Sequence, residues 1–203
     1  MTPQDEDAAH INAYAPGGVG LLIIDMINDL RFSGAECLRR KADAVAAVAL
    51  KLRGDADNLG VPVIYVNDNY GQWHSEKSKI VEACAAAAPD GGDLVRRVAP
   101  RDGDYFVIKP QFSGFYATNL PVLLPRLGVD RLVLAGLAAD ICVLFTAADA
   151  HMREYGLWVP SDAVASREDE RTAWALEIMR DAMGADTRST EDLRLAAWAG
   201  QGA

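Results

Sequence analysis

The chain has 203 residues, half of them hydrophobic, and carries a formal net charge of −9 at pH 7. This length is enough for one sizeable core, so we expect a single domain over residues 1–203. The excess of acidic residues argues against nucleic acid as a partner and against an anionic membrane surface. A small-molecule substrate is therefore the expected partner.

The sequence indicates no membrane anchor and no disulfide framework. No stretch approaches the roughly 20 apolar residues of a membrane-spanning helix. Residues 1–7 are acidic, whereas a signal peptide begins with basic residues. The cysteines, Cys37, Cys84 and Cys142, are odd in number and form no CxxC pair, which is typical of reduced thiols. We therefore expect no membrane partner, a cytoplasmic location, and a mobile tail at residues 1–16.

Short apolar runs predict the strands. Five such runs lie at residues 19–26, 61–67, 105–109, 131–137 and 157–160, and a weaker sixth lies at 186–190. The first four are apolar or β-branched without strict alternation, as in strands that are covered on both faces. Because helical segments separate the runs, we predict a three-layer α/β/α, Rossmann-like fold with a mainly parallel sheet of five or six strands.

Four helices are predicted between the strands, at residues 37–59, 119–127, 140–155 and 168–183. In the first helix the apolar residues recur at helical spacing, at Leu38, Ala42, Val45, Ala49 and Leu52. A glycine follows each of the four segments, as is common where helices end. Asp140 is predicted to be the N-cap of the third helix.

Residues 69–104 form the longest stretch without a clear strand or helix pattern, around the alanine-rich segment 75–88. A connection this long in a compact domain is more often a functional loop or lid than a plain turn. We expect it to help shape a pocket.

Three reactive side chains fall at the ends of predicted strands. Asp25 and Lys109 end the first and third strands, and Cys142 follows the fourth strand at the start of a helix. The carboxyl ends of parallel strands share one edge of the sheet, and ligands bind in the crevice there. We therefore expect an acid, a cation and a thiol to meet in one pocket.

Each of the three residues has a simpler interpretation when it is taken alone. Cys142 is then a small buried side chain, Asp25 an ion-pair partner or cap, and Lys109 a solvated strand end. Together they suit nucleophilic catalysis. A helix N-terminus lowers the pKa of a cysteine, and a carboxylate takes a thiol proton and returns it to a leaving amine. Lys109, whose backbone Pro110 keeps extended, would orient Asp25 and offset negative charge.

At these positions the sequence resembles the isochorismatase-like cysteine hydrolases, a superfamily that includes nicotinamidases and N-carbamoylsarcosine amidohydrolases. The resemblance extends from about residue 19 to about residue 166. Its motifs are residues 25–29, 109–115 and 136–143.

The resemblance implies roles for individual residues. Asp25, Lys109 and Cys142 correspond to the catalytic triad of the family. The family has a non-proline cis peptide just before its cysteine, which corresponds to Leu137 and Ala138. The backbone N–H groups of Ala138 and Cys142 would then form the oxyanion hole. Association into dimers or tetramers is common in the family, so we expect a homo-oligomer.

Two positions depart from the family pattern. Ile27 stands where the family often has glutamine, so any contact of that side chain is lost. Nicotinamidases bind a metal through an aspartate and several histidines after the second strand, but this chain has only His74 there. We therefore expect no metal, and no cofactor, and nicotinamide becomes a poorer substrate.

Residues after the second and third strands are candidates for the substrate pocket. They are Asn67, Asn69, Trp73, Phe112 and Phe115. An Asn- and Gly-rich turn explains the two asparagines equally well, and core packing is expected for at least one phenylalanine. Asp68 should reach the same edge of the sheet. His151 is expected on a helix surface, and Cys37 and Cys84 are interpreted as structural.

The leading hypothesis is a cysteine-dependent hydrolase of a small amide or carbamoyl compound that forms a thioester intermediate. One alternative is vinyl-ether hydrolysis of the isochorismatase type, which in the resembling family does not require the cysteine. Another is a non-catalytic small-molecule binding protein on the same scaffold. A redox-sensor role for Cys142 is also open, although it leaves Asp25 and Lys109 unexplained.

Overall fold

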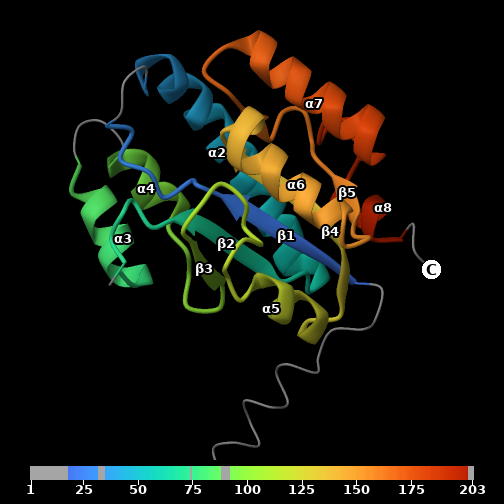
Figure 1. Ribbon diagram of the computed structural model, residues 1–203, viewed down its shortest axis with the longest axis horizontal. Coiled ribbons are helices and arrows are strands. Elements are labelled where there is room, and N and C mark those ends of the chain that lie inside the picture. The colour runs from blue at the N-terminus through green and yellow to red at the C-terminus, as the bar shows by residue number, and fades with distance from the viewer. Residues whose placement is uncertain (1–17, 32–34, 74, 88–91, 201–203) are drawn as a thin grey trace, which may run out of the picture.

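The computed structural model describes residues 18–31, 35–73, 75–87 and 92–200 (Figure 1). The tail expected at residues 1–16 lies outside the described residues. Those that are described contain a six-stranded sheet in which every pairing is parallel. Its strands are β1 (Gly18–Ile24), β2 (Val63–Asp68), β3 (Tyr105–Lys109), β4 (Val129–Leu137), β5 (Gly156–Trp158) and β6 (Val164–Ala165).

The strand order is β3-β2-β1-β4-β5, and β6 also pairs with β4. β5 pairs with the first half of β4 and β6 with its end, so these two short strands share one edge. The order reverses at β1, whose neighbours are β2 and β4. In an open parallel sheet such a reversal opens a crevice at the carboxyl ends of the strands.

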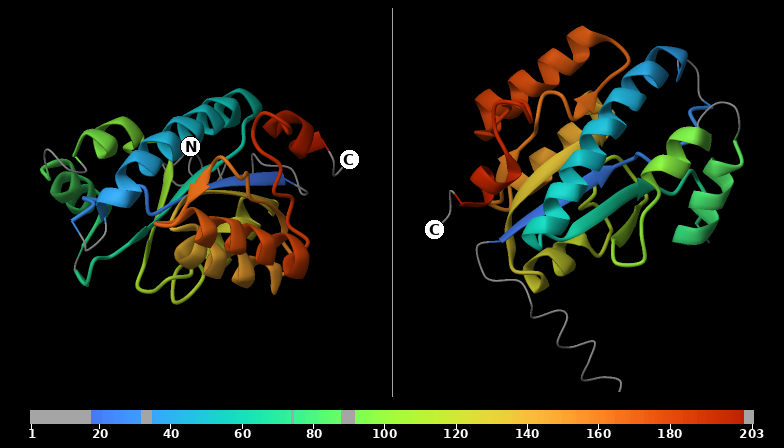
Figure 2. Two further views of the ribbon diagram at one scale, coloured as in Figure 1. Left: turned by 90° about the horizontal axis from the view of Figure 1, so that it is seen from above. Right: turned by 180° about the vertical axis from the view of Figure 1, so that it is seen from behind.

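Helices cover both faces of the sheet (Figure 2, left). One face carries α2 (Ala35–Leu59), α3 (Lys77–Ala85), α4 (Gly92–Val98) and α8 (Leu195–Gly200). The other carries α5 (Leu120–Arg126), the π-helical turn η1 (Ala139–Val143), α6 (Leu144–His151) and α7 (Asp169–Met183). Within β1, Leu21 and Ile23 face the first layer, and Leu22 and Ile24 face the second. The three-layer α/β prediction is confirmed.

The long helix α2 follows the sequence prediction closely. It begins two residues before residue 37, and its predicted apolar positions, Leu38, Ala42, Val45, Ala49 and Leu52, are all buried. Gly60 follows it with a left-handed backbone, at φ +66°. Neither α2 nor any other helix in the described part of the chain is long and apolar enough to cross a membrane.

The prediction of a sixth strand at residues 186–190 is wrong. Only Asp186 forms an isolated bridge, to Trp158, because side-chain bonds fold the residues that follow it. The Asp186 carboxylate accepts the Arg188 N–H, and Asp162 accepts the Thr190 N–H. The sixth strand is instead β6, which at two residues is too short to give a sequence signal.

Two ordered helices occupy the stretch that the sequence left without secondary structure. In α3, Ile80 and Cys84 are buried, and in α4, Leu94 and Val95 are buried in the same core. The prediction of an irregular loop over residues 69–104 is therefore wrong for these segments. Each helix spans only two or three turns, which is shorter than the window over which helical spacing of apolar residues becomes a clear signal.

The helix predicted at residues 140–155 is present, but both of its ends differ from the prediction. It begins as η1, continues as α6 and ends at His151, whose side chain is exposed. Asp140 is not its N-cap, since Ala138 takes that position without a side-chain bond. The Asp140 carboxylate instead accepts hydrogen bonds from Ser166 Oγ and Arg171. These contacts attach the turn after β4 to the start of α7.

Gly136 lies near the end of β4, where it pairs with Ile24 of β1. Its φ is +132°, and a Cβ at this position would lie 2.0 Å from the carbonyl oxygen of Ile24. Because the backbone of β1 fills this space, only glycine fits.

We expect Gly136→Ala to destabilise the fold by at least about 3 kcal/mol, from backbone strain together with the clash. Gly54→Ala is the matched control, since a Cβ on Gly54 of α2 meets nothing within 4 Å. That change should stabilise the protein by about 1 kcal/mol. Urea unfolding measures both variants, and equal stability of the two would contradict the assignment.

Candidate active site

The ends of three strands place the candidate catalytic side chains. Asp25 follows β1, Lys109 is the last residue of β3, and Cys142 lies in η1 after β4. The chain leaves β1 toward α2 on one face and leaves β4 toward α6 on the other. The crevice between these two connections is the topological switch point of the sheet, where parallel α/β proteins bind their ligands.

Lys109 lies between the acid and the thiol. Its Nζ is 2.9 Å from Asp25 Oδ2 and 3.4 Å from Cys142 Sγ. The Asp25 carboxylate is close enough to the Cys142 thiol for its charge to raise the pKa of that thiol. The Lys109 side chain is fully buried, and it reaches from β3 across the end of β2 toward β1 and β4. The three residues therefore form one connected cluster.

Asp68 joins this cluster from β2. It pairs with Lys109 in the strand register, and its Oδ2 lies 3.4 Å from Lys109 Nζ. Its backbone N–H donates to Asp25 Oδ1 at 2.7 Å. The sequence placed Asp68 at this edge but did not indicate its contact with Lys109. The available signal is that Asp68 ends the strand between the two that carry Asp25 and Lys109.

The backbone of Asp25 has φ +50°, which is uncommon outside glycine and is tolerated by aspartate. Its N–H still donates to the Val66 carbonyl at 2.9 Å, as a continuation of the β1 and β2 ladder. The turn at Asp25 directs the carboxylate over the end of the sheet, where it meets Lys109.

Burial shapes the charges of the triad. Burial raises the pKa of Asp25, and the charge of Lys109 offsets only part of this rise. Burial alone lowers the pKa of Lys109, but the charges of Asp25, Cys142 and Asp68 and the hydrogen bond to Asp25 together outweigh it, and the net pKa is raised. For Cys142, burial and then the Asp25 charge raise the pKa. The lowered pKa predicted from the helix N-terminus is therefore wrong, because desolvation and the carboxylate dominate.

The raised pKa of Cys142 decides how the thiol can react. Its sulfur keeps the proton in the resting site, so a nucleophile has to be generated by passing that proton to a base. Asp25, which contacts the same Lys109 Nζ as the thiol, is placed to accept it. Lys109 remains charged next to both groups and favours the form in which negative charge lies on sulfur.

The turn before Cys142 presents backbone groups to the pocket. The peptide bond between Leu137 and Ala138 is cis, at the position that the resemblance indicates. The Ala138 carbonyl accepts the N–H groups of Ile141 and Val143. Within the described residues, the Ala138 N–H has no backbone acceptor. Ala138 and Cys142 both line the pocket, as an oxyanion hole requires.

A second network of hydrogen bonds joins this turn to the residues around the start of α7. Ser166 is fully buried, donates through Oγ to Asp140 at 2.5 Å and accepts the Asp140 N–H at 3.0 Å. Arg171 of α7 donates to the same carboxylate at 2.8 Å. Burial raises the pKa of Asp140, but the bonds from Ser166 and Arg171 outweigh it and the net pKa is lowered. Asp140 therefore stays ionised and fixes the turn.

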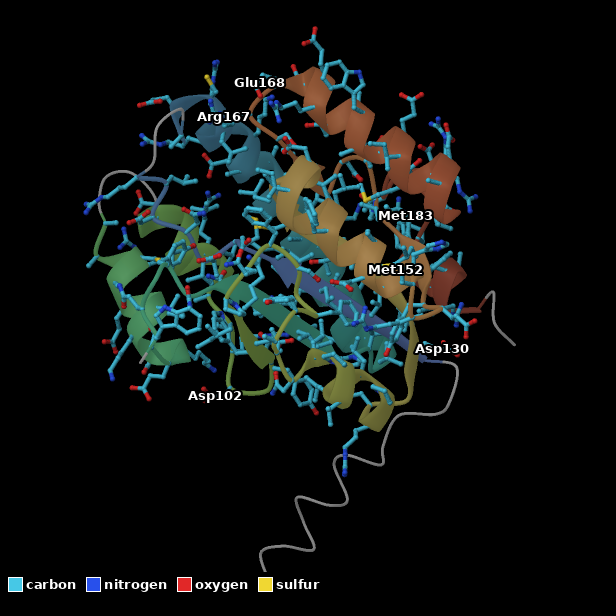
Figure 3. All side chains as sticks on the ribbon, in the orientation of Figure 1. Asp102, Asp130, Met152, Arg167, Glu168 and Met183 are labelled. Atoms are coloured by element: carbon cyan, nitrogen blue, oxygen red, sulfur yellow. The ribbon has the colours of Figure 1, made fainter. Side chains whose placement is uncertain are left out.

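A pocket of about 430 Å³ opens over the triad. Arg167 and Glu168, which precede α7, are among its lining residues and lie near the first turns of α2 (Figure 3). It is lined by Asp25, Asn28, Leu38, Asp68, Tyr70, Phe112, Leu137, Ala138, Asp140, Ile141, Cys142, Arg167, Glu168 and Arg171. This mixture of apolar and charged groups suits a small polar molecule.

Of the five residues predicted for the substrate pocket, Phe112 lines it and is half exposed. Asn67 and Asn69 are buried and do not line it. The Asn67 amide pairs with both backbone groups of Ile27, and Asn69 Oδ1 accepts the Gly71 N–H. The turn interpretation therefore holds for Asn69. Asn67 instead lies in β2 and binds the loop after β1, and the pocket assignment of both residues is corrected.

Trp73 and Phe115 also do not line the pocket. Trp73 is 75% exposed and lies outside the pocket lining. Phe115 is 3% exposed and packs in the core, with its ring 5.9 Å from that of Tyr155. The sequence pattern does not separate Phe112 from Phe115, because both lie in one turn after β3 and only the fold decides which ring turns inward.

Tyr70 is a pocket residue that the sequence analysis missed. Its hydroxyl donates to the Ile27 carbonyl at 2.6 Å, and its ring lines the pocket. The same carbonyl accepts Asn67 Nδ2 and, at 3.8 Å, the Cys84 thiol. The Ile27 side chain is buried, so the loop after β1 is held through its backbone.

The other cysteines and the histidine of this region are distinct from the triad. Cys84 is buried, and burial raises its pKa to about 11, whereas Cys37 is exposed. Within the described ranges, no group of His, Cys, Asp and Glu side chains is arranged to hold a metal ion. His74 lies outside the described residues.

Comparisons with known proteins show similarity over most of the chain. The Isochorismatase domain model matches residues 19–192. The uncharacterized isochorismatase family protein YaaI of Bacillus subtilis (strain 168) is 40% identical over 173 residues, which are 85% of this chain and 94% of that protein. Isochorismatase of the same strain is 29% identical over 168 residues, which are 80% of this chain and 53% of that protein.

A solved structure also matches over most of its length. The crystal structure of N-carbamoylsarcosine amidase from Thermoplasma acidophilum is 32% identical, with a TM-score of 0.68. The match covers 87% of this chain and 99% of that chain.

The buried ion pair predicts a specific pattern of stability. Lys109→Met leaves the Asp25 carboxylate buried without a counter-charge and should cost about 3 to 5 kcal/mol. The double variant Asp25→Asn with Lys109→Met removes both charges and should regain most of this loss. Lys79→Met, at an exposed pair with Glu76, is the control and should cost less than about 1 kcal/mol. Urea unfolding distinguishes the variants, and a double variant less stable than Lys109→Met would contradict the pairing.

Proposed function

Because the chain belongs to the isochorismatase family, whose members are hydrolases, we propose that it hydrolyses a small amide or carbamoyl compound with Cys142 as nucleophile. The observation that carries this proposal is the position of Lys109 Nζ, 2.9 Å from Asp25 and 3.4 Å from Cys142, at the base of a pocket. The fold relative named as an N-carbamoylsarcosine amidase supports the same class of reaction.

The first half of the reaction forms a thioester. Asp25 takes the proton of the Cys142 thiol while Sγ attacks the substrate carbonyl carbon. The carbonyl oxygen becomes an oxyanion, which the N–H groups of Ala138 and Cys142 stabilise. The intermediate then collapses, and the C–N bond breaks as Asp25 returns the proton to the leaving nitrogen.

The second half hydrolyses the thioester. Asp25, again ionised, takes a proton from a water molecule that attacks the same carbonyl carbon. The C–S bond breaks, the acid leaves, and Cys142 regains its proton. Lys109 stays charged throughout and offsets the negative charge that passes between carboxylate, sulfur and oxyanion. No cofactor takes part in these steps.

A vinyl-ether hydrolase of the isochorismatase type is the second candidate, because an isochorismatase is among the relatives. In the resembling family that reaction does not need the cysteine, whereas the thiol here lies 3.4 Å from Lys109 Nζ, which also contacts Asp25. Measuring pyruvate release beside ammonia release separates the two activities.

A non-catalytic binding protein is the third candidate. In that case Cys142 would react with iodoacetamide no faster than the exposed Cys37. Under the proposed mechanism, Asp25 acts as a base for the thiol, and Cys142 reacts faster. We also propose a dimer or tetramer of this single-domain chain, on the strength of the family resemblance, which analytical ultracentrifugation measures.

The nucleophile is tested by trapping its acyl adduct. Intact-mass measurement against a panel of small amides, carbamoyl compounds and ureides should reveal an acyl group on the wild-type protein. Cys142→Ser should lower turnover by at least about a thousandfold, as removal of a nucleophile does in other hydrolases. Cys37→Ala is the matched control and should keep the wild-type rate. Near-normal turnover by Cys142→Ser would refute the mechanism.

The pH dependence of kcat/KM is tested on the substrate that the screen identifies. Burial raises the pKa of Asp25 above its ordinary 3.8, so the base becomes protonated and activity falls as the pH decreases through that raised value. The pKa of Lys109 is raised above 10.5, so the activity should then stay level up to about pH 9. An acid limb at or below pH 3.8 would contradict the role of Asp25.

A further inference from the structure

Lys109 contacts two carboxylates, and the proposed reaction uses only one of them. Asp25 is the base, whereas Asp68 has no part in the steps above. We propose that Asp68 binds an N–H of the substrate nitrogen, and thereby selects primary amides and terminal carbamoyl groups. This inference rests on the proposed hydrolase function and names its substrate class.

The exposure of the two carboxylates differs. The Asp68 side chain is 33% exposed and lines the pocket, whereas that of Asp25 is 8% exposed. Lys109 is fully buried beneath both. Of the two acids on this lysine, Asp68 is therefore the one with surface available to a bound molecule.

The hydrogen bonds of Asp68 leave acceptor capacity. Oδ1 accepts the Tyr70 N–H at 2.7 Å, and Oδ2 lies 3.4 Å from Lys109 Nζ. An ionised carboxylate accepts about four hydrogen bonds, so Oδ2 retains lone pairs for another donor. The Tyr70 bond also fixes the orientation of the carboxylate, with Oδ1 turned to the backbone and Oδ2 toward Lys109.

The distance to the nucleophile suits a small amide. Asp68 Oδ2 and Cys142 Sγ each lie 3.4 Å from the same Lys109 Nζ, so they are no farther apart than twice that distance. A carbonyl carbon beside Sγ places its nitrogen within this span. With the carbonyl oxygen toward the Ala138 and Cys142 N–H groups, the nitrogen lies on the side of the two carboxylates.

The two acids then divide the contacts of that nitrogen. Asp25 delivers a proton to the nitrogen lone pair, and Asp68 accepts one of its N–H groups. A primary amide or terminal carbamoyl nitrogen has this hydrogen to donate. A dialkylated nitrogen has none, and it would bring methyl groups against a carboxylate, which costs desolvation without a compensating bond.

Two thiol reagents of equal shape test the inference without a known substrate. Chloroacetamide carries an NH₂ group where chloroacetone carries CH₃. With each, the S–C bond forms as the C–Cl bond breaks, chloride leaves, and Asp25 takes the thiol proton. Peptide mapping by mass spectrometry gives the alkylation rate of Cys142 relative to Cys37 in the same molecule. The exposed Cys37 corrects for the intrinsic reactivity of the reagents.

In the wild-type protein, Cys142 should prefer chloroacetamide over chloroacetone, after this correction, by roughly tenfold or more, as a hydrogen bond to a charged group allows. In Asp68→Asn the amide oxygen stays with the Tyr70 N–H, so its NH₂ group replaces Oδ2 and faces the reagent. The preference should then vanish. Asp68→Ala, which removes the acceptor without adding a donor, should also lose it, and thermal unfolding verifies that each variant is folded.

The outcomes separate this inference from the function on which it rests. If wild-type Cys142 reacts rapidly but shows no preference, or if both variants keep it, the inference is overturned and the hydrolase proposal stands. If both variants slow the two reagents equally, Asp68 acts only through Lys109, and the inference is again overturned. If wild-type Cys142 reacts no faster than Cys37 with either reagent, the hydrolase proposal itself fails.

Discussion

The burial of one ammonium group governs the arrangement of the whole site. Lys109 has no access to solvent, so its charge depends on the carboxylates around it, Asp25 at 2.9 Å and Asp68 at 3.4 Å. A buried charge without partners would cost several kcal/mol. The strand order β3-β2-β1-β4 brings those partners to one edge, and the thiol of Cys142 enters the same cluster. The strand order therefore determines which reactive groups surround this lysine.

The sequence predicts the framework because strands and strand ends leave strong signals. The apolar runs of β1 to β4 located the buried sheet, and the spacing of Leu38 to Leu52 located α2. Since parallel strands share an edge, the charges at their ends were expected to meet, and the structure brings Asp25, Lys109 and Cys142 together. Short elements such as β6 and α4 gave no comparable signal.

The pocket wall was harder to predict, because it depends on the direction of side chains in turns. Phe112 and Phe115 lie three residues apart, yet one lines the pocket and the other packs in the core. Asn67 lies near the end of β2 and Tyr70 follows that strand, and tertiary contacts with Ile27 decide the roles of both. The pKa of Cys142 depends on tertiary surroundings in the same way, since burial and the charge of Asp25 outweigh the local helix position.

The loop after β1 is specified through main-chain atoms at Ile27, whose N–H and carbonyl both pair with the Asn67 amide. The side chain at this position contributes only its bulk to the interior. Another residue of similar volume could therefore replace Ile27 during evolution without moving Asp25, because the backbone bonds of position 27 would be unchanged. Asn67 cannot be replaced in the same way, because no other side chain offers both a hydrogen-bond donor and an acceptor at the same length.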